Sequence, residues 1–240
     1  MKLTYIYHSC YTIETDKFSV IFDYYKDSGN TPYKGYIHEE LLRKKSPLYV
    51  LASHHHPDHF NKHILDWKKE KKEIIYILSS DILTEKKANS EAGVFLKKND
   101  IWKDENITIK AFGSTDAGIS FLIRMDEKTI FHAGDLNNWH WKDESTAEEA
   151  EIAEKSFLLE VNDIAKFTND ITITMFPIDP RLGNDYMLGA EQLISKIKVG
   201  TIAPMHFGEA YDKANNFASI AEKNNCKFLS LSHKGECFTI

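Results

Sequence analysis

Cysteine is scarce in this chain, and its scarcity excludes the class of small secreted proteins that are held together by disulfides. Only three cysteines occur among 240 residues, Cys10, Cys226 and Cys237. They are too few and too scattered for a disulfide framework, and they show no metal-motif spacing. An odd number of separate thiols suits a reducing compartment, so we expect a cytoplasmic protein.

Long apolar runs are also missing. No segment approaches the roughly 18 consecutive apolar residues that a membrane-spanning helix needs. The first residues, MKLTYI, lack the apolar stretch of a signal peptide. The sequence therefore predicts a soluble protein that has no membrane partner.

Positive charge is not in excess, and no linker divides the chain. The net charge is −6, whereas a surface that follows nucleic-acid phosphates is normally basic. We therefore expect a small-molecule substrate and no nucleic-acid partner, while the oligomeric state stays open.

With 42% hydrophobic residues and no Pro/Gly/Ser-rich linker or repeat, the chain is predicted to form a single domain over residues 1–240.

What the sequence does contain is a concentration of histidine behind one apolar run. Residues 47–52, PLYVLA, are typical of a buried strand, and residues 53–59, SHHHPDH, follow with four histidines and one carboxylate. Imidazole is the commonest side chain that binds zinc and similar metals, and a neighbouring carboxylate adds charge neutralisation and a base. This segment therefore predicts a metal centre at the end of a strand.

The spacing within this segment separates its residues into two groups. His54 and His56 are two positions apart, so they point the same way in an extended chain. Pro57 breaks the strand direction and allows Asp58 and His59 to turn toward a second position. A solvated histidine-rich loop is the structural alternative to this ligand arrangement.

The pattern His-X-His-X-Asp-His over residues 54–59 resembles the signature of the metallo-β-lactamase superfamily of metal-dependent hydrolases. Two later segments fit the same resemblance, FHAGD at 131–135 and IAPMHF at 202–207. In that family these segments supply ligands to two neighbouring metal sites. The resemblance implies six ligands here: His54 and His56 at a first site, Asp58, His59 and His206 at a second, and Asp135 bridging both.

The N-terminal segments extend the resemblance. Residues 3–14 and 18–23 alternate apolar and polar side chains as a half-buried antiparallel hairpin does. They are similar to the opening hairpin of the branch that includes ascorbate-6-phosphate lactonase and related phosphodiesterase-like proteins. The implied fold is α/β, an αββα four-layer sandwich of the metallo-β-lactamase type. His8, near the first turn, is interpreted either as a structural histidine or as a donor beside the site.

One position departs from the family pattern. The third ligand of the first site is usually a histidine in a turn, and here that turn holds Ser114. Either Asp116 supplies an oxygen ligand, or water completes the site, or only the second site is filled; a further alternative is that His140 is the missing ligand. Carboxylates bind zinc and suit harder ions such as manganese. The resemblance favours one or two Zn²⁺ ions, with Mn²⁺ or iron as alternatives.

Two further loops contain groups able to contact a substrate. Asn137 and His140 could hydrogen-bond a substrate, and Trp139 could form an apolar wall, unless it anchors the loop in the core. Arg181 offers a planar fork for a carboxylate or phosphate, and Asp179 could orient either this arginine or a ligand histidine. A structural arginine on the surface is the alternative.

Apolar periodicity predicts the helices that separate these loops. Residues 146–167 repeat apolar side chains at helical intervals, at Ile152, Phe157, Leu158, Val161 and Ile164. Three shorter helices are predicted over residues 62–72, 189–198 and 214–223.

These features together predict a metal-dependent hydrolase. A metal-bound hydroxide would cleave an ester, lactone, amide or phosphodiester bond, and Asp58 or Asp135 would accept or relay a proton. The residues do not choose among the four bonds, because one fold serves many substrates. Two alternatives belong to other classes: a non-catalytic metal- or ligand-binding protein and a di-iron redox protein on the same fold.

Overall fold

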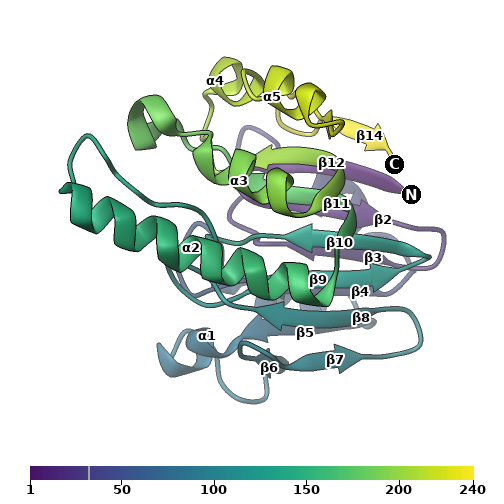
Figure 1. Cartoon of the computed structure of the whole chain (residues 1–240). Coiled ribbons are helices and arrows are strands. Elements are labelled where there is room, and N and C mark those ends of the chain that lie inside the picture. The colour runs from purple at the N-terminus through teal and green to yellow at the C-terminus, as the bar shows by residue number, and fades with distance from the viewer. Residues whose placement is uncertain (32) are drawn as a thin grey trace. The chain divides into compact units, whose positions relative to one another are not determined.

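The chain consists of two compact units, each built on one seven-stranded sheet (Figure 1). The structure is a computed structural model that describes residues 1–31 and 33–240. The first unit comprises Met1–Leu96 and Ser232–Ile240, and the second comprises Lys97–Leu231.

The sheet of the first unit has the order β14-β1-β2-β3-β4-β5-β6. Its strands are antiparallel from β14 to β3 and parallel from β3 to β6. The predicted opening hairpin is confirmed as the antiparallel strands of this sheet. The strand bounds are β1 Lys2–Tyr7, β2 Cys10–Glu14, β3 Ser19–Phe22, β4 Leu48–Ala52, β5 Ile74–Ser79, β6 Val94–Leu96 and β14 Cys237–Thr239.

Three short helices cover apolar side chains of this sheet. They are the π-helix η1 (Ile37–Leu41), the 3-10 helix η2 (Lys62–Lys69) and α1 (Ser80–Thr84). Each contributes buried residues to one apolar cluster with β3, β4 and β5. All five residues of β4 are buried, as expected for a parallel strand that is covered on both faces. The core therefore holds the strand end from which the histidine-rich segment departs.

The second unit repeats the same sheet layout. Its order is β13-β12-β11-β10-β9-β8-β7, antiparallel from β7 to β10 and parallel from β10 to β13. The two halves are thus alike in strand direction, although no repeat is visible in their residues. The bounds are β7 Ile101–Lys103, β8 Thr108–Phe112, β9 Ser120–Met125, β10 Lys128–His132, β11 Asp170–Pro177, β12 Lys198–Met205 and β13 Lys227–Phe228.

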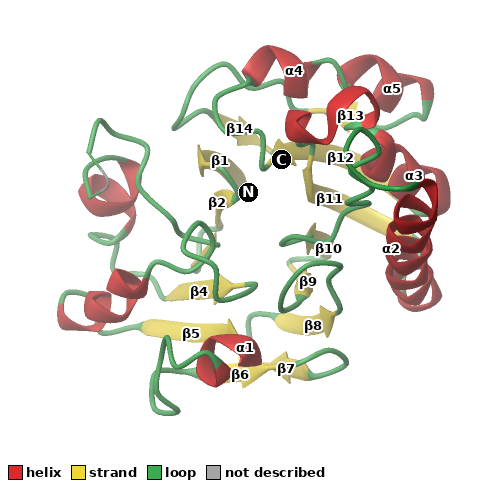
Figure 2. Ribbon diagram, turned by 90° about the vertical axis from the view of Figure 1, so that its left-hand side faces the viewer, coloured by secondary structure: helices red, strands yellow, loops and turns green. Residues whose placement is uncertain are grey.

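Helices of the second unit lie along its sheet (Figure 2). The longest, α2, packs against α3 and β8, while α3 packs on β11 and β12 and α5 on β13. Their bounds are α2 Ala147–Phe167, the 3-10 helix η3 Pro180–Asp185, α3 Leu188–Lys196, α4 Tyr211–Asn215 and α5 Ala218–Lys223. In the described ranges 1–31 and 33–240, none of the helices is both long and apolar enough to cross a membrane.

The helix predictions need three corrections. The helix predicted over residues 62–72 is a shorter 3-10 helix, and the one over 214–223 is divided into α4 and α5. In α2 the predicted core residue Ile152 is 56% exposed. It lies two positions after the buried Ala150, about 200° around the helix, and therefore on the opposite face.

A buried carboxylate in the first unit predicts pH-dependent stability. Asp27 accepts hydrogen bonds from the backbone N–H groups of Ser28, Ile37 and His38 and from His38 Nδ1, at 2.7–3.0 Å. Burial alone would raise the pKa of Asp27, but the hydrogen bonds from His38 and the backbone outweigh it, and the net pKa is lowered.

The stability that Asp27 contributes is therefore present above its ordinary pKa of about 3.9 and is lost as pH falls through the lower folded-state pKa. The free energy of unfolding should fall in Asp27→Asn at pH 7, and this deficit should shrink below about pH 4. Urea unfolding between pH 7 and pH 3 measures it. Asp66→Asn is the control, since this carboxylate is 58% exposed and pairs with the exposed side chains of His63 and Lys69. A deficit for Asp27→Asn that stays constant to pH 3 would contradict the assignment.

Candidate metal centre

In the first unit, two chain segments meet where the parallel strands β3 and β4 end. Asp23 directly follows β3, and its backbone N–H donates to the carbonyl of Leu51 in β4. Residues 53–59 directly follow β4. Groups at the carboxyl ends of parallel strands gather at one sheet edge, which is where open α/β sheets place their sites. The histidine-rich segment therefore begins beside Asp23.

Asp23 organises this segment through a fully buried carboxylate. It accepts hydrogen bonds from the backbone N–H of Ser53 at 2.7 Å, from the Ser53 hydroxyl at 2.6 Å, and from His59 Nδ1 at 2.7 Å. An ionised carboxylate can only accept, so His59 must carry its proton on Nδ1. Its Nε2 then presents a lone pair, which is the arrangement that a metal-binding histidine requires.

The three consecutive histidines divide between two directions. The ring centroids of His54 and His56 lie 4.6 Å apart, and those of His54 and His59 lie 4.1 Å apart. His55 turns instead to α1, where Asp81 accepts from both its backbone N–H at 3.0 Å and its Nδ1 at 2.7 Å. The ring of His55 also lies 4.6 Å from that of His56, so the pairing with Asp81, and not distance, distinguishes the middle histidine from the predicted ligands.

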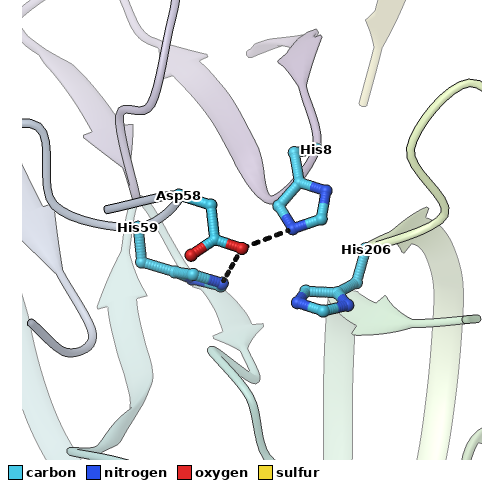
Figure 3. A group of neighbouring side chains, drawn as sticks. All are labelled: His8, Asp58, His59 and His206. Atoms are coloured by element: carbon cyan, nitrogen blue, oxygen red, sulfur yellow. Dashed lines mark ion pairs between the residues drawn. The ribbon is translucent and has the colours of Figure 1, made fainter. Parts of the chain in front are cut away.

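His8 lies against Asp58, beside the histidine-rich segment, where the alternative of a donor beside the site would place it. His8 Nε2 is 3.3 Å from Asp58 Oδ2, and His59 Nε2 is 4.0 Å from the same oxygen (Figure 3). Burial would raise the pKa of Asp58, but the hydrogen bond from His8 and the nearby imidazoles hold it well below its usual range. Asp58 is therefore an anion at neutral pH and is suited to a cation.

In the second unit, two aspartates and one histidine follow the three central parallel strands. Asp135 follows β10, Asp179 follows β11 and His206 follows β12. His206 Nε2 is 3.4 Å from Asp135 Oδ1, and both side chains are buried. The predicted bridging carboxylate and the predicted last ligand therefore lie together in this unit.

Asp179 holds His206 as Asp23 holds His59. Its Oδ2 lies 2.9 Å from His206 Nδ1, and the same carboxylate accepts from Arg181 Nε at 2.9 and 3.0 Å. Burial would raise the pKa of Asp179, but the hydrogen bonds from His206 and Arg181 lower it to about 2. His206 Nε2 is therefore directed toward Asp135, and Arg181 lies beside the same histidine, with its Nη2 3.3 Å from His206 Nδ1, as well as pairing with Asp179.

Asp116 lies near Asp135, as the oxygen-ligand alternative requires. One oxygen from each carboxylate lies within 4.8 Å of the other. The turn is held to the loop after Asp135 by Thr115, whose hydroxyl donates to Asn137 O at 2.6 Å and accepts from Asn137 N at 3.0 Å. The Ser114 hydroxyl accepts from the backbone N–H of Asp116 at 3.3 Å. Ser114 therefore caps this turn beside Asp135.

The predicted substrate contacts separate into two groups. The Trp139 indole N–H donates to the backbone carbonyl of Asp135 at 2.8 Å, and its ring lies edge-on to His206 with centroids 5.5 Å apart. Asn137 is fully buried and lies close to α3. A Cβ atom added to Gly189 of this helix would lie only 2.0 Å from Asn137 Oδ1. Trp139 is thus beside the site, whereas Asn137 lies in the core.

His140 is engaged within its own unit. Its Nε2 lies 3.2 Å from the carbonyl of Asp185, and its Nδ1 accepts from the backbone N–H of Lys142 at 3.2 Å. Both ring nitrogens are occupied, so no lone pair is left for a metal and no N–H for a substrate. These contacts argue against the sequence-based roles of His140 as a metal ligand or a substrate contact.

Backbone strain marks the same positions. Nine non-glycine residues in the described ranges have positive φ angles, which are uncommon for such residues, and four of them lie at or beside these groups: His8 at 56°, Asp23 at 44°, Trp141 at 41° and His206 at 66°. Such conformations cost energy and gather at functional sites. No sequence signal indicated them, and the role of Asp81 was likewise not predicted.

A comparison with known families decides the classification. Residues 2–153, more than half of the chain, match the family model described as a beta-lactamase superfamily domain. The chain belongs to the metallo-β-lactamase superfamily. A UPF0173 protein of Pyrococcus abyssi is 30% identical over 145 residues, which are 56% of this chain and 60% of that protein. The chain thus matches less than two thirds of this curated relative's length.

Two solved structures have the same fold. Igni18, described as a novel metallo hydrolase from Ignicoccus hospitalis, aligns with a TM-score of 0.69 at 18% identity over 100% of this chain and 98% of its own. The metallo-β-lactamase fold protein YhfI of Bacillus subtilis aligns with a TM-score of 0.65 at 14% identity, covering 99% of each chain. The predicted α/β fold of the metallo-β-lactamase type is confirmed.

Proposed function

We propose that this protein is a metal-dependent hydrolase of a small cytoplasmic substrate. One observation carries the proposal: each unit contains a ligand-type histidine whose Nδ1 is held by a buried aspartate, His59 by Asp23 and His206 by Asp179. Metal-binding histidines are almost always held in this way, because the second hydrogen bond fixes the ring and its tautomer. The proposed metal ligands are His54, His56, Asp58, His59, Asp135 and His206, with Asp116 in place of the usual third histidine.

The donor set fits a divalent transition metal. Imidazole nitrogens together with carboxylates suit Zn²⁺, and the larger share of oxygen that Asp116 would bring also suits Mn²⁺ or iron. The depressed pKa of Asp58 keeps that group charged at neutral pH. When bound, such a metal lowers the pKa of water toward ~7 and polarises a carbonyl or phosphoryl oxygen.

The surrounding side chains supply orientation and proton handling. Asp58 is the proposed proton acceptor, and His8 Nε2, 3.3 Å away, stabilises the anionic form of the carboxylate. The Trp139 ring covers one edge of His206 and limits the access of water to it. Arg181 is paired with Asp179 through Nε and Nη2, so we assign it to positioning His206; its side chain is 64% exposed and keeps further N–H donors for a substrate.

The bond that is cleaved belongs to the ester, lactone, amide or phosphodiester class. Similarity of the opening hairpin to the branch of ascorbate-6-phosphate lactonase and phosphodiesterase-like proteins makes lactones and phosphodiesters the first substrates to test. The chain should be purified without added metal, its metal content determined, and hydrolysis measured on a phosphodiester, a lactone, an ester and an amide. We expect at least one bound ion and one hydrolysed substrate, with activity lost to a chelator and restored by the metal.

Three results would redirect this proposal. Bound metal without turnover of any class would favour a binding protein. An absorption spectrum of paired irons would favour a redox enzyme. Turnover that survives complete chelation would remove the metal from the reaction.

The Ser114 position provides a prediction about the first metal site. Ser114→His should raise the metal-to-protein ratio after dialysis, because it restores a neutral nitrogen ligand in the turn beside Asp135. It should also add thermal stability that depends on added metal, since an ion that binds only the folded state shifts unfolding by mass action. Asp116→Asn tests whether Asp116 is the substitute ligand. This substitution alone should lower the metal content, whereas in the double variant Ser114→His/Asp116→Asn the loss should be much smaller. No change in either quantity would show that this turn does not face the metal.

A further inference from the structure

A cavity of about 440 Å³ lies in the first unit, at the edge of the sheet where β4 and β5 begin. Its walls come from η1 and from two turns, residues 42–45 and residues 70–73. The histidine-rich segment follows the other end of β4, so the length of this strand, roughly 16 Å, separates the two. The proposed hydrolase function therefore assigns nothing to this cavity.

Positive charge predominates around the cavity. The residues that line it are His38, Leu42, Arg43, Lys44, Lys45, Glu70, Lys71, Lys72 and Glu73. Five of them are lysine or arginine and two are glutamate. The Lys44 ammonium is paired with Glu14, which does not line the cavity. Four positive side chains then remain against two carboxylates, which leaves an excess of about two positive charges.

Lys71 is the buried member of this group. It is only 5% exposed, and its ammonium donates one hydrogen bond, to the Lys44 carbonyl at 2.6 Å. Among residues 1–31 and 33–240, no carboxylate lies within 4 Å of this ammonium. Burial lowers the pKa of Lys71, and the charge of Glu73 opposes this effect only in part. A buried charge without a counterion is unfavourable, so Lys71 favours an anion in this cavity.

We propose that this cavity binds a small molecule that carries a phosphate group. Such a group has about 1.5 to 2 negative charges at neutral pH, which matches the excess of positive charge. It would compensate Lys71 and accept hydrogen bonds from the exposed side chains of Arg43 and Lys72. The volume is that of a small-molecule site, and the two glutamates would repel the successive phosphates of a nucleic acid. The inference goes beyond the proposed function and needs no metal for its test.

Inorganic pyrophosphate is a suitable probe, and trimethyl phosphate, which has the same tetrahedral centre without a charge, is its control. Binding to the chelated full-length protein would be followed by the backbone amide NMR signals of residues 42–45 and 70–73. We expect saturable shifts with pyrophosphate that weaken as added salt screens the charges, and no such shifts with trimethyl phosphate. The absence of saturable shifts with pyrophosphate, or equal binding of both probes, would overturn the proposal.

Three variants separate the cavity from the charge of the whole protein. Lys71→Met should weaken pyrophosphate binding at least about tenfold, because it removes the buried charge and keeps an apolar side chain of similar length. The double variant Arg43→Gln/Lys72→Gln should weaken it by about as much, and it tests the proposal even if Lys71→Met does not fold. Lys87→Gln is the matched control, because this exposed lysine follows α1 and does not line the cavity.

Lys87→Gln should bind pyrophosphate as the natural protein does. Equal effects of Lys87→Gln and Lys71→Met would show that only net charge is measured, and would overturn the proposal. Tighter binding of a single-stranded oligonucleotide than of pyrophosphate at the same residues would replace the small molecule by a nucleic acid. Because the protein is metal-free here, these outcomes are independent of whether it hydrolyses anything.

Discussion

Asp23→Asn is expected to lower the affinity of this protein for its metal by roughly 10- to 100-fold while the fold is retained. Asparagine has nearly the same volume and keeps one oxygen for the backbone N–H of Ser53. Its amide nitrogen, however, would face His59 Nδ1 as a donor, and His59 would have to accept there. The ring proton would then move to Nε2, which could no longer bind a metal.

Metal content after dialysis measures this effect, and the melting temperature of the chelated protein shows whether the fold is intact. Asp81→Asn is the matched control, because Asp81 also lies 2.7 Å from a histidine Nδ1 in the same unit, that of His55, which is not a proposed ligand. It should retain the metal. Equal metal loss in both variants would mean that Asp23 acts only through the stability of the loop.

His206→Ala should remove more metal than His54→Ala, with a loss of affinity that exceeds about 100-fold and of nearly all hydrolysis. The proposed second site combines Asp58, His59 and His206 with the bridging Asp135. The proposed first site has two imidazoles and the substituted third position. Removing a ligand from the more complete site should therefore cost more.

Metal binding by both variants should be compared at buffered free metal concentrations, with the exposed His233→Ala as the control. Asp179→Asn adds a finer test, because it leaves His206 in place but removes the acceptor that orients its Nδ1. It should give an intermediate loss. Greater loss from His54→Ala than from His206→Ala would reverse the ranking of the two sites.

Local patterns were sufficient to predict most of the strands and the ligand-bearing segments. Burial of β4 follows from its apolar run. The pairing of His55 with Asp81 does not follow from the period of two, because residues 53–59 form bends and turns and not an extended strand. Helix α2 begins at Ala147, directly after the N-cap Thr146, because a capping box with Glu149 satisfies its first N–H groups, and both residues of this box can be recognised in the sequence.

The similar layout of the two sheets and the contacts of the loops could not be predicted from local sequence patterns. The two sheets have the same order of antiparallel and parallel strand pairs. The direction of a strand does not fix its residues, so the two halves of the sequence show no common pattern. His140 has the composition of a ligand, yet its nitrogens bond the backbone at Lys142 and Asp185, the latter far along the chain. The same composition is therefore compatible with a structural role, and only the contacts distinguish the two.

The sequence by itself determined the superfamily and the fold class and indicated the candidate metal-binding histidines and aspartates, because each of the motifs consists of residues close together in the chain. Only the tertiary structure decided how those residues are held. Asp23 reaches His59 because β3 and β4 are parallel neighbours, and Asp179 reaches His206 because β11 and β12 are. Pairing between strands brings together residues that are remote in sequence, and no local periodicity encodes such a contact.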